Sequence, residues 1–181
     1  EALGQDAARD KALFEELLEI CLEDNLIVDA AIAHSRHELD RIWGIRENVE
    51  FIFSVHKTAF LFDVSLAISD MDGYIRQIKS DLQNVWPDVS FYAFGHMGDG
   101  NLHLFICCGK DDADTKHRVD GIVYEPLEKI GGSITGEHGV GLEKKSWLYL
   151  SRTSEEIQLM KTLKKALDPK GILNPGKLLP D

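Results

Sequence analysis

The chain has 181 residues, of which 44% are hydrophobic and 28% are charged, which is the balance of an ordinary globular protein. Its formal net charge of −11 has the wrong sign for a protein that binds nucleic acid or an anionic membrane surface. No apolar run approaches the roughly 20 residues of a membrane-spanning helix, and the acidic N-terminal residues do not predict a signal peptide.

Hydrophobic periodicity predicts helices and strands in alternation within a single domain over residues 1–181. Helices are expected over residues 8–25, 34–50, 70–84, 111–130 and 155–167. Strands are expected over residues 26–33 and 59–68, and over 90–107 with a break at 98–100. Ser69 is expected to cap the third helix, and Gly131 with Gly132 to end the fourth. This order predicts an α+β fold, a mostly antiparallel sheet covered by helices in a ferredoxin-like arrangement, with a C-terminal helix and tail.

The three cysteines, Cys21, Cys107 and Cys108, are odd in number and have no CxxC spacing. They therefore indicate neither a disulfide framework nor a zinc ribbon. Cys21 lies in a helical pattern, and the adjacent pair ends a strand-like run. We interpret all three as buried thiols in a reducing compartment.

A hairpin signal brings two histidines together. Asp99 and Gly100 stand between two β runs, and Asp-Gly is typical of a type I′ turn. Pairing outward from that turn predicts that His96 and His103 lie directly opposite each other, with Cβ atoms about 5 Å apart on one face. Two imidazoles in that position could bind one metal ion.

A second glycine-rich segment, residues 136–141, contains the adjacent acid and base Glu137 and His138. Glycine leaves room for a ligand and permits unusual backbone angles. Glu137 could supply a third metal ligand, and two neutral imidazoles with one carboxylate would leave positions open for substrate oxygens. Because adjacent side chains usually point apart, we expect Glu137 and His138 to have different roles.

Other readings of these residues stay open. The glycine-rich segments could be only a tight turn and a flexible loop, and the remaining histidines could be structural; these are His34, His37, His56 and His117. The chain has neither a GxxxxGK[ST] nor a GxGxxG motif, so nucleotide binding by this chain alone is not indicated. A self-contained metal-dependent hydrolase that uses the same three ligands is one alternative function, and a non-catalytic binding module is another.

Three motifs in the same chain resemble a known family. Residues 95–103 (GHMGDGNLH), 136–141 (GEHGVG) and 168–177 (DPKGILNPGK) stand in the order found in FAD-linked oxidases of the vanillyl-alcohol oxidase superfamily, in their C-terminal region. Within that superfamily the chain is most similar to D-lactate, glycolate and D-2-hydroxyglutarate dehydrogenases. The likeness extends from the segment around Trp43 and Arg46 to the C-terminus.

The resemblance implies roles for particular residues. His96, His103 and Glu137 match the family's divalent-metal ligands, which generally bind zinc or manganese, and His138 matches the base that takes the proton of the substrate hydroxyl. Three further residues have roles that the resemblance implies. Arg46, in the segment Trp43-Gly44-Ile45-Arg46-Glu47, matches an arginine that pairs with the substrate carboxylate. Asn174 and Lys177 match the segment that returns to the flavin domain.

The resemblance also implies a reaction and partners. Family members oxidise a 2-hydroxy acid to a 2-oxo acid and pass a hydride to FAD, which an N-terminal domain holds. This sequence lacks that domain, so we expect the chain alone to be inactive and the domain to be its partner. We expect no nucleic-acid partner and no membrane span. A homodimer is compatible with the resemblance, the electron acceptor is not indicated, and the expected compartment is the cytoplasm, or the mitochondrion in a eukaryote.

One departure from the family bears on the substrate. Glu50 and Leu61 stand where the D-2-hydroxyglutarate enzymes have a threonine and a lysine for the distal carboxylate. An acid would repel that second negative group, and a leucine would not hold it. We therefore predict a monocarboxylic D-2-hydroxy acid, whose side chain Leu61 and nearby apolar residues receive.

Overall fold

The computed structural model describes residues 4–96 and 98–180, and the chain forms two compact units, Glu1–Val49 and Glu50–Asp181. Each unit is described by itself. That the two act together as a single domain over residues 1–181 stays a prediction.

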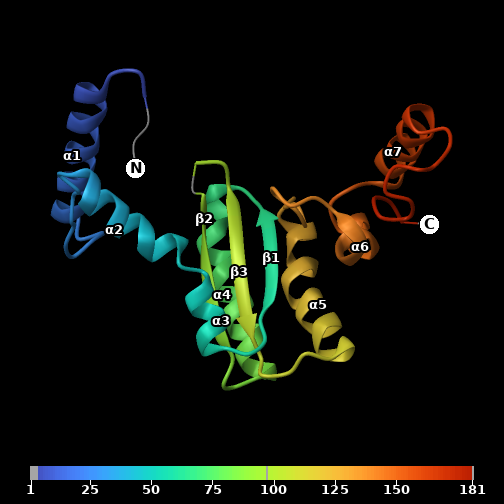
Figure 1. The fold of residues 1–181 in the computed structure, drawn as a ribbon. Coiled ribbons are helices and arrows are strands. Elements are labelled where there is room, and N and C mark those ends of the chain that lie inside the picture. The colour runs from blue at the N-terminus through green and yellow to red at the C-terminus, as the bar shows by residue number, and fades with distance from the viewer. Residues whose placement is uncertain (1–3, 97, 181) are drawn as a thin grey trace. The chain divides into compact units, whose positions relative to one another are not determined.

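The first unit contains two helices, α1 (Ala7–Glu23) and α2 (Arg36–Glu47) (Figure 1). Asp6 caps α1 by accepting two backbone N–H groups of the first turn, and Ser35 accepts the N–H of Glu38 at the start of α2. The strand expected over residues 26–33 is not formed, so that prediction was wrong. A β-favouring composition does not supply the neighbouring strand that backbone N–H and C=O groups need, and none of the described residues pairs with this segment.

In the second unit three strands form an antiparallel sheet in the order β1-β3-β2. Their bounds are β1 (Phe60–Ser65), β2 (Ser90–His96) and β3 (Asn101–Cys107). Helix α4 (Ile68–Val85) connects β1 to β2, and α5 (Ala113–Lys129) follows β3, which gives the split βαβ arrangement of ferredoxin-like folds. An isolated bridge between Ser65 and Ser133 stands on the free edge of β1, where a fourth strand would be added. The predicted α+β fold is confirmed.

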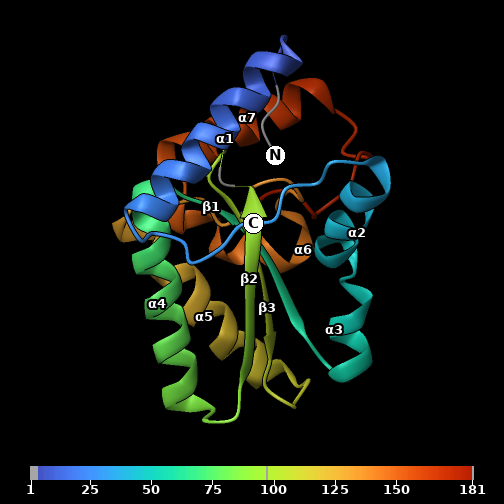
Figure 2. The same cartoon turned by 90° about the vertical axis from the view of Figure 1, so that its left-hand side faces the viewer.

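Both long helices pack on the same face of this sheet (Figures 1 and 2). Alternate residues of β1 and β3 point into that layer, and the most deeply buried side chains of the sheet and the two helices are Val64, Leu104, Ile106, Ile78, Leu82, Val119, Val123 and Leu127. Burying one such side chain contributes roughly 1.5–3 kcal/mol to folding. The intervening strand residues point to the opposite face, where the polar groups described below lie.

A short helix, α3 (Glu50–Val55), lies against that opposite face (Figure 2). The ring of Phe53 in α3 is 6.0 Å from the ring of Phe105 in β3, measured between centroids. The sequence predicted one helix over residues 34–50, but α2 ends at Glu47 and α3 begins after a break.

Two predictions concerned the ends of the long helices. Helix α4 begins at Ile68 after the N-cap residue Ala67, which makes no side-chain cap, so the prediction that Ser69 caps this helix was wrong. The end of α5 agrees with the prediction. Gly131, which directly follows the C-cap residue Ile130, is in the left-handed conformation with a φ of 63°.

The C-terminal part begins with two short helices that the sequence did not predict, α6 (Gly141–Lys144) and the 3-10 helix η1 (Lys145–Leu150). They form because Trp147, Leu148 and Leu150 bury their side chains in the core. The predicted last helix is present as α7 (Ser154–Leu167), with a capping box between Thr153 and Glu156.

The cysteine thiols are free, as expected. Cys107 is buried at the end of β3, but Cys21 and Cys108 are only half-buried, so the interpretation of all three as buried thiols was wrong for these two. Burial raises the pKa of Cys108 to about 11, and that of Cys107 is raised by the same cause. Thiols with raised pKa values are poor nucleophiles at neutral pH, so Cys107 and Cys108 are not candidate nucleophiles.

Candidate active site

The β2–β3 hairpin has a different register from the predicted one. His96 pairs with Asn101, and His103 pairs with Phe94, so the prediction that the two histidines lie directly opposite each other was wrong. The connection spans residues 97–100 instead of the two residues of a type I′ turn: Gly100 has a φ of 75°, but Asp99 does not have a positive φ. The predicted partner of Leu102, Met97, lies outside the described residues, and Leu102 pairs with Gly95.

The two histidines nevertheless share one face of the sheet. The observed register differs from the predicted one by two residues, and side chains of a strand alternate with a period of two. His96 and His103 are therefore diagonal neighbours instead of direct neighbours, and their ring centroids lie 5.6 Å apart. Diagonal positions on adjacent strands are within reach of long side chains.

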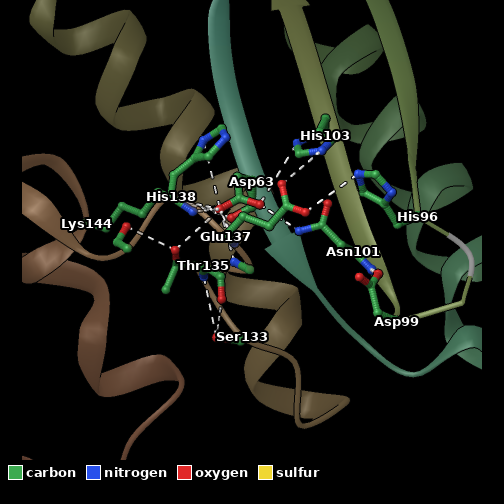
Figure 3. A network of polar contacts seen from close by, with 12 residues as sticks. Asp63, His96, Asp99, Asn101, His103, Ser133, Thr135, Glu137, His138 and Lys144 are labelled. Atoms are coloured by element: carbon green, nitrogen blue, oxygen red, sulfur yellow. Dashed lines mark hydrogen bonds and ion pairs between the residues drawn. The ribbon is translucent and has the colours of Figure 1, made fainter. Parts of the chain in front are cut away.

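Glu137 reaches these two histidines from the loop between α5 and α6 (Figure 3). Its Oε1 lies 3.6 Å from Nε2 of His96, and its Oε2 lies 3.7 Å from Nε2 of His103. One potential ligand atom from each of the three residues lies within 4.8 Å of the other two. The structure thus brings together the three residues that the sequence singled out as ligands.

The donor set fits a divalent metal ion. Ligands about 2.1 Å from a tetrahedral zinc ion stand about 3.4 Å apart, which is close to the two nitrogen-to-oxygen distances given above. Burial lowers the pKa of His103, although Asp63 and Glu137 oppose this effect, and the neutral imidazole is the form that binds metal. The Oδ1 atom of Asn101 is also buried and lacks a hydrogen-bond partner among the described residues, so the cluster offers a further oxygen donor.

Sequence reasoning missed the residue on which the site is built. Asp63, in the middle of β1, is 1% exposed. Its Oδ2 accepts hydrogen bonds from the backbone N–H groups of Gly136, Glu137 and His138, at 3.1, 2.9 and 2.8 Å. A signal was present in the sequence, because Asp63 is the only charged residue in the apolar run 59–68, and a buried acid in a strand requires partners.

The charge on Asp63 is balanced within the site. Burial by itself raises its pKa, but the bonds from the His138 backbone, the Asn101 side chain and the Glu137 backbone, together with Lys144, hold the pKa well below its usual range. Lys144 is itself buried, with Nζ 3.7 Å from Oδ2 of Asp63 and a hydrogen bond of 3.1 Å to the Asp63 carbonyl oxygen. Burial lowers the pKa of Lys144, and Asp63 counteracts that effect.

His138, the predicted base, lies beside the ligand cluster. Its ring stacks on that of His103, with centroids 5.7 Å apart, and its side chain is 65% exposed. Its Nδ1 lies 3.9 Å from Oδ2 of Asp63. Nδ1 therefore faces the buried carboxylate, and Nε2 lies on the other side of the ring.

Apolar side chains continue the same sheet face beyond His103. Phe105 and Phe94 stack with ring centroids 5.5 Å apart, and the Phe94 ring is 5.6 Å from that of His103. Leu61, the predicted contact for the substrate side chain, is opposite Phe105 in the sheet register and is 49% exposed. The exposed Leu61 and the half-buried Phe94 thus form an apolar surface beside the candidate metal-ligand cluster, while Phe105 is buried and packs against Phe53.

Asn174 and Lys177 have no described contact with this cluster, and Arg46 lies in the first unit, which is described by itself. Arg46 belongs to the first unit, where it forms an ion pair with Glu47 and lines a cavity of about 680 Å³ with Trp43. Asn174 and Lys177 are exposed in the tail after α7, where Asn174 has a φ of 47° and its carbonyl oxygen accepts the N–H of Lys177. Their predicted roles toward substrate and flavin stay predictions.

Comparison with known proteins gives one family. The sequence model of the FAD linked oxidases, C-terminal domain, matches residues 1–178. A mitochondrial D-2-hydroxyglutarate dehydrogenase of Danio rerio is 35% identical over 181 residues, which is all of this chain and 34% of that protein. A D-2-hydroxyglutarate dehydrogenase of Stutzerimonas stutzeri is 36% identical over 88% of the chain and 35% of that protein. A putative mitochondrial D-lactate dehydrogenase of Schizosaccharomyces pombe is 35% identical over 98% of the chain and 35% of that protein.

The chain therefore spans about a third of the length of these relatives. In the part of the chain that the structure describes, no helix is both long enough and apolar enough to cross a lipid bilayer. The match extends over both compact units and includes all three glycine-containing motifs.

Proposed function

Since the chain belongs to the family of C-terminal domains of FAD-linked oxidases, we propose that it is the metal- and substrate-binding part of a flavin-dependent D-2-hydroxy-acid dehydrogenase. The observation that carries this proposal is the convergence of His96, His103 and Glu137, with His138 stacked beside them. A two-histidine, one-carboxylate set leaves positions open for substrate oxygens, as a catalytic site requires. FAD would be held mainly by the part of the protein that the relatives have beyond this chain.

In the proposed reaction, the metal and the flavin would each supply one part of the chemistry, and residues of this chain supply the rest. Bound there, a divalent metal, zinc or manganese, would act as a Lewis acid on the carboxylate and hydroxyl oxygens of the substrate, while the flavin would take up the hydride from carbon 2. Nε2 of His138 accepts the hydroxyl proton in this scheme, since Nδ1 faces Asp63. The products are a 2-oxo acid and reduced flavin.

The apolar surface next to the cluster supports a substrate with a single carboxylate. A side chain that extends from carbon 2 along the sheet face meets Leu61 and Phe94, neither of which can pair with a second negative group. Most of the relatives compared are named D-2-hydroxyglutarate dehydrogenases, and a putative D-lactate dehydrogenase has about the same identity, so percentage identity by itself does not decide between the two substrates. We propose a monocarboxylic D-2-hydroxy acid with an apolar side chain.

Arg46 is the proposed partner of the substrate carboxylate, and Asn174 and Lys177 are proposed to lie next to the flavin. The proposed protein partner is the FAD-binding part of the same enzyme. The Danio rerio and Schizosaccharomyces pombe relatives are named mitochondrial proteins, and we propose the same compartment if the source is a eukaryote, with the cytoplasm otherwise.

The test is anaerobic reduction of the flavin in the complete protein, followed by its absorbance. D-2-hydroxy acids are expected to bleach the flavin and their L-enantiomers are not, and a chelator is expected to abolish the bleaching. The His138→Ala variant should bind metal and flavin but bleach at least about 100-fold more slowly, which is the usual contribution of a general base. A flavin spectrum that no 2-hydroxy acid changes would refute the proposed substrate class, and a protein without flavin would bring the metal-dependent hydrolase forward.

A further inference from the structure

We propose that Asp63 is the positioning residue of this site: its buried carboxylate holds the Glu137–His138 loop and the histidine hairpin in the arrangement that binds metal. The inference rests on the proposed metal site, and it adds a residue that touches neither metal nor substrate. Asp63 joins three separate parts of the chain, because β1 provides the carboxylate, β3 provides Asn101 and His103, and the loop before α6 provides Glu137 and His138.

The loop is held by one oxygen atom. Three consecutive backbone N–H groups, those of Gly136, Glu137 and His138, converge on Oδ2 of Asp63 (Figure 3). Three donors on a charged acceptor fix the course of the backbone through these residues. Fixing the backbone also fixes where the next bonds point, which directs the Glu137 carboxylate between the two histidines and places the His138 ring against that of His103.

The other oxygen atom holds the hairpin. Oδ1 of Asp63 accepts the side-chain amide of Asn101 at 2.7 Å and lies 3.9 Å from Nδ1 of His103, its direct partner in the β1–β3 register. Nε2 of the same ring faces Glu137 at 3.7 Å, so the buried carboxylate and the proposed ligand Glu137 lie on opposite sides of the imidazole. Carboxylates commonly orient metal-binding histidines in this way.

Every described polar group that contacts the Asp63 carboxylate is a hydrogen-bond donor or a cation, and the loop backbone lies too close to the carboxylate to move nearer. A Cβ atom at Gly136 would lie 2.0 Å from Nδ2 of Asn101 and 2.9 Å from Oδ1 of Asp63, so the loop approaches as closely as glycine allows. Lys144 completes the set with its ammonium group 3.7 Å from Oδ2. Both carboxylate oxygens are therefore needed as acceptors.

Asp63→Asn is a sharp test because it keeps the shape and changes only the hydrogen bonding. With Asn101 in its observed orientation, the new NH2 group faces either the NH2 group of Asn101 or the three backbone N–H groups of the loop, and two donors that face each other cannot both be satisfied. A turned Asn101 amide relieves that clash, but the loop then loses its charged acceptor for a neutral carbonyl oxygen, and Lys144 loses its buried counter-charge in either case. We expect the affinity for zinc or manganese to fall about 10–100-fold, the usual effect of losing such an outer partner.

The measurement is a titration of zinc, and separately of manganese, into the complete protein in competition with a chromophoric chelator. Asp168→Asn is the matched control, because Asp168 is also a buried carboxylate that accepts two backbone N–H groups, those of Ile172 and Leu173, and contacts a lysine, Lys164. It lies in the tail after α7 and contacts none of the three ligands, so its metal affinity should stay within about threefold of the wild type, because it is not one of the outer partners of the metal.

A reciprocal exchange separates positioning from simple destabilisation. In Asp63→Asn/Asn101→Asp, the amide of residue 63 can donate to the new carboxylate and still offer its carbonyl oxygen to the loop, so affinity should recover to within about tenfold of the wild type. Asn101→Asp alone places two carboxylates against each other and should lower the affinity, which controls for the added charge near the metal.

The outcomes are distinct. Wild-type affinity in Asp63→Asn, an equal loss in Asp168→Asn, or a folded exchange variant that does not recover would overturn the inference while the proposed metal site stands. If Asp63→Asn does not fold, the exchange variant measured against Asn101→Asp decides the question. A wild-type protein that binds neither metal would refute the proposed metal site and this inference together.

Discussion

Asp63 and His103 are direct partners across β1 and β3, and Nδ1 of the imidazole lies 3.9 Å from the carboxylate while Nε2 lies 3.7 Å from Glu137. The His103 imidazole thus lies between the buried carboxylate of Asp63 and the half-exposed carboxylate of Glu137. In the proposed site, the inner carboxylate orients the ring and the outer carboxylate is a metal ligand. This proposed division of roles accounts for an acid in a strand with an otherwise apolar sequence.

The proposed metal site predicts a large effect for each ligand. His103→Ala should lower the affinity for zinc by more than about 100-fold, because even the outer partners of a metal site cost 10–100-fold when removed. The measurement is competition with a chromophoric chelator. His37→Ala, at an exposed position of α2, is the matched control and should leave the affinity unchanged. Equal affinities in the two variants would contradict the assignment of His103 as a ligand.

Replacing glycine by alanine should have opposite effects on the free energy of unfolding at Gly136 and at Gly73. Gly136→Ala places a Cβ atom 2.0 Å from the Asn101 amide, so we expect a loss of about 1–3 kcal/mol in the free energy of unfolding. Gly73→Ala, at an exposed position within α4 with nothing near its Cβ, should add about 0.5–1 kcal/mol. Urea unfolding measures both. A neutral Gly136→Ala would show that the loop does not pack as tightly as the contacts indicate.

In and around the sheet core, the loss of unfolding free energy on replacing a leucine should depend strongly on how deeply that leucine is buried. Leu104 in β3 is fully buried between the sheet and the two long helices, so Leu104→Ala should cost about 2–5 kcal/mol of unfolding free energy. Leu159→Ala in α7, where the leucine is 58% exposed, should change it by less than about 0.5 kcal/mol. Similar losses at both positions would mean that α7 is covered in the protein.

The apolar surface beside the cluster predicts the substrate. Leu61→Lys adds a cation opposite Phe105 and should raise kcat/KM for D-2-hydroxyglutarate relative to D-lactate by about tenfold, the equivalent of roughly 1.4 kcal/mol. Steady-state kinetics of the complete enzyme measures this ratio. Leu142→Lys adds the same charge at a position that is 61% exposed in α6 and should leave the ratio unchanged. A wild type that already prefers D-2-hydroxyglutarate would refute the monocarboxylic assignment.

The tail after α7 predicts a pH-dependent contribution to stability. The hydrogen bond from Lys164, and then those from the Leu173 and Ile172 backbone, hold the pKa of Asp168 below its usual range. A carboxylate whose folded pKa is depressed stabilises the fold above its unfolded pKa of 3.8 and loses that effect as the pH falls through the folded value. Asp168→Asn should therefore unfold at lower urea than the wild type at pH 7, with a gap that narrows below pH 3.8. The exposed Asp88→Asn should show no such gap.

The sequence by itself determined the elements with strong periodicity and the identity of the chemical groups. The strands Phe60–Ser65, Ser90–His96 and Asn101–Cys107 lie within the predicted runs of β-favouring apolar residues bounded by turn residues. The alternation of strand residues was enough to place His96 and His103 on one face. That conclusion survived an error in the register because the error was two residues, an even number. Residues 26–33 show the limit, since their composition favours a strand but no strand is present among the described residues of their unit to pair with them.

Only the tertiary structure decided how the cluster is assembled. Glu137 is 34 residues after His103 in sequence, and no local pattern determines how a glycine-rich loop returns to a sheet. The loop returns because Asp63 offers a buried acceptor for its three N–H groups, and that acceptor is acceptable in the core only because Asn101 and Lys144 reach it from two other segments. A buried charge is stable only with all its partners present, and these partners meet only when the chain has folded.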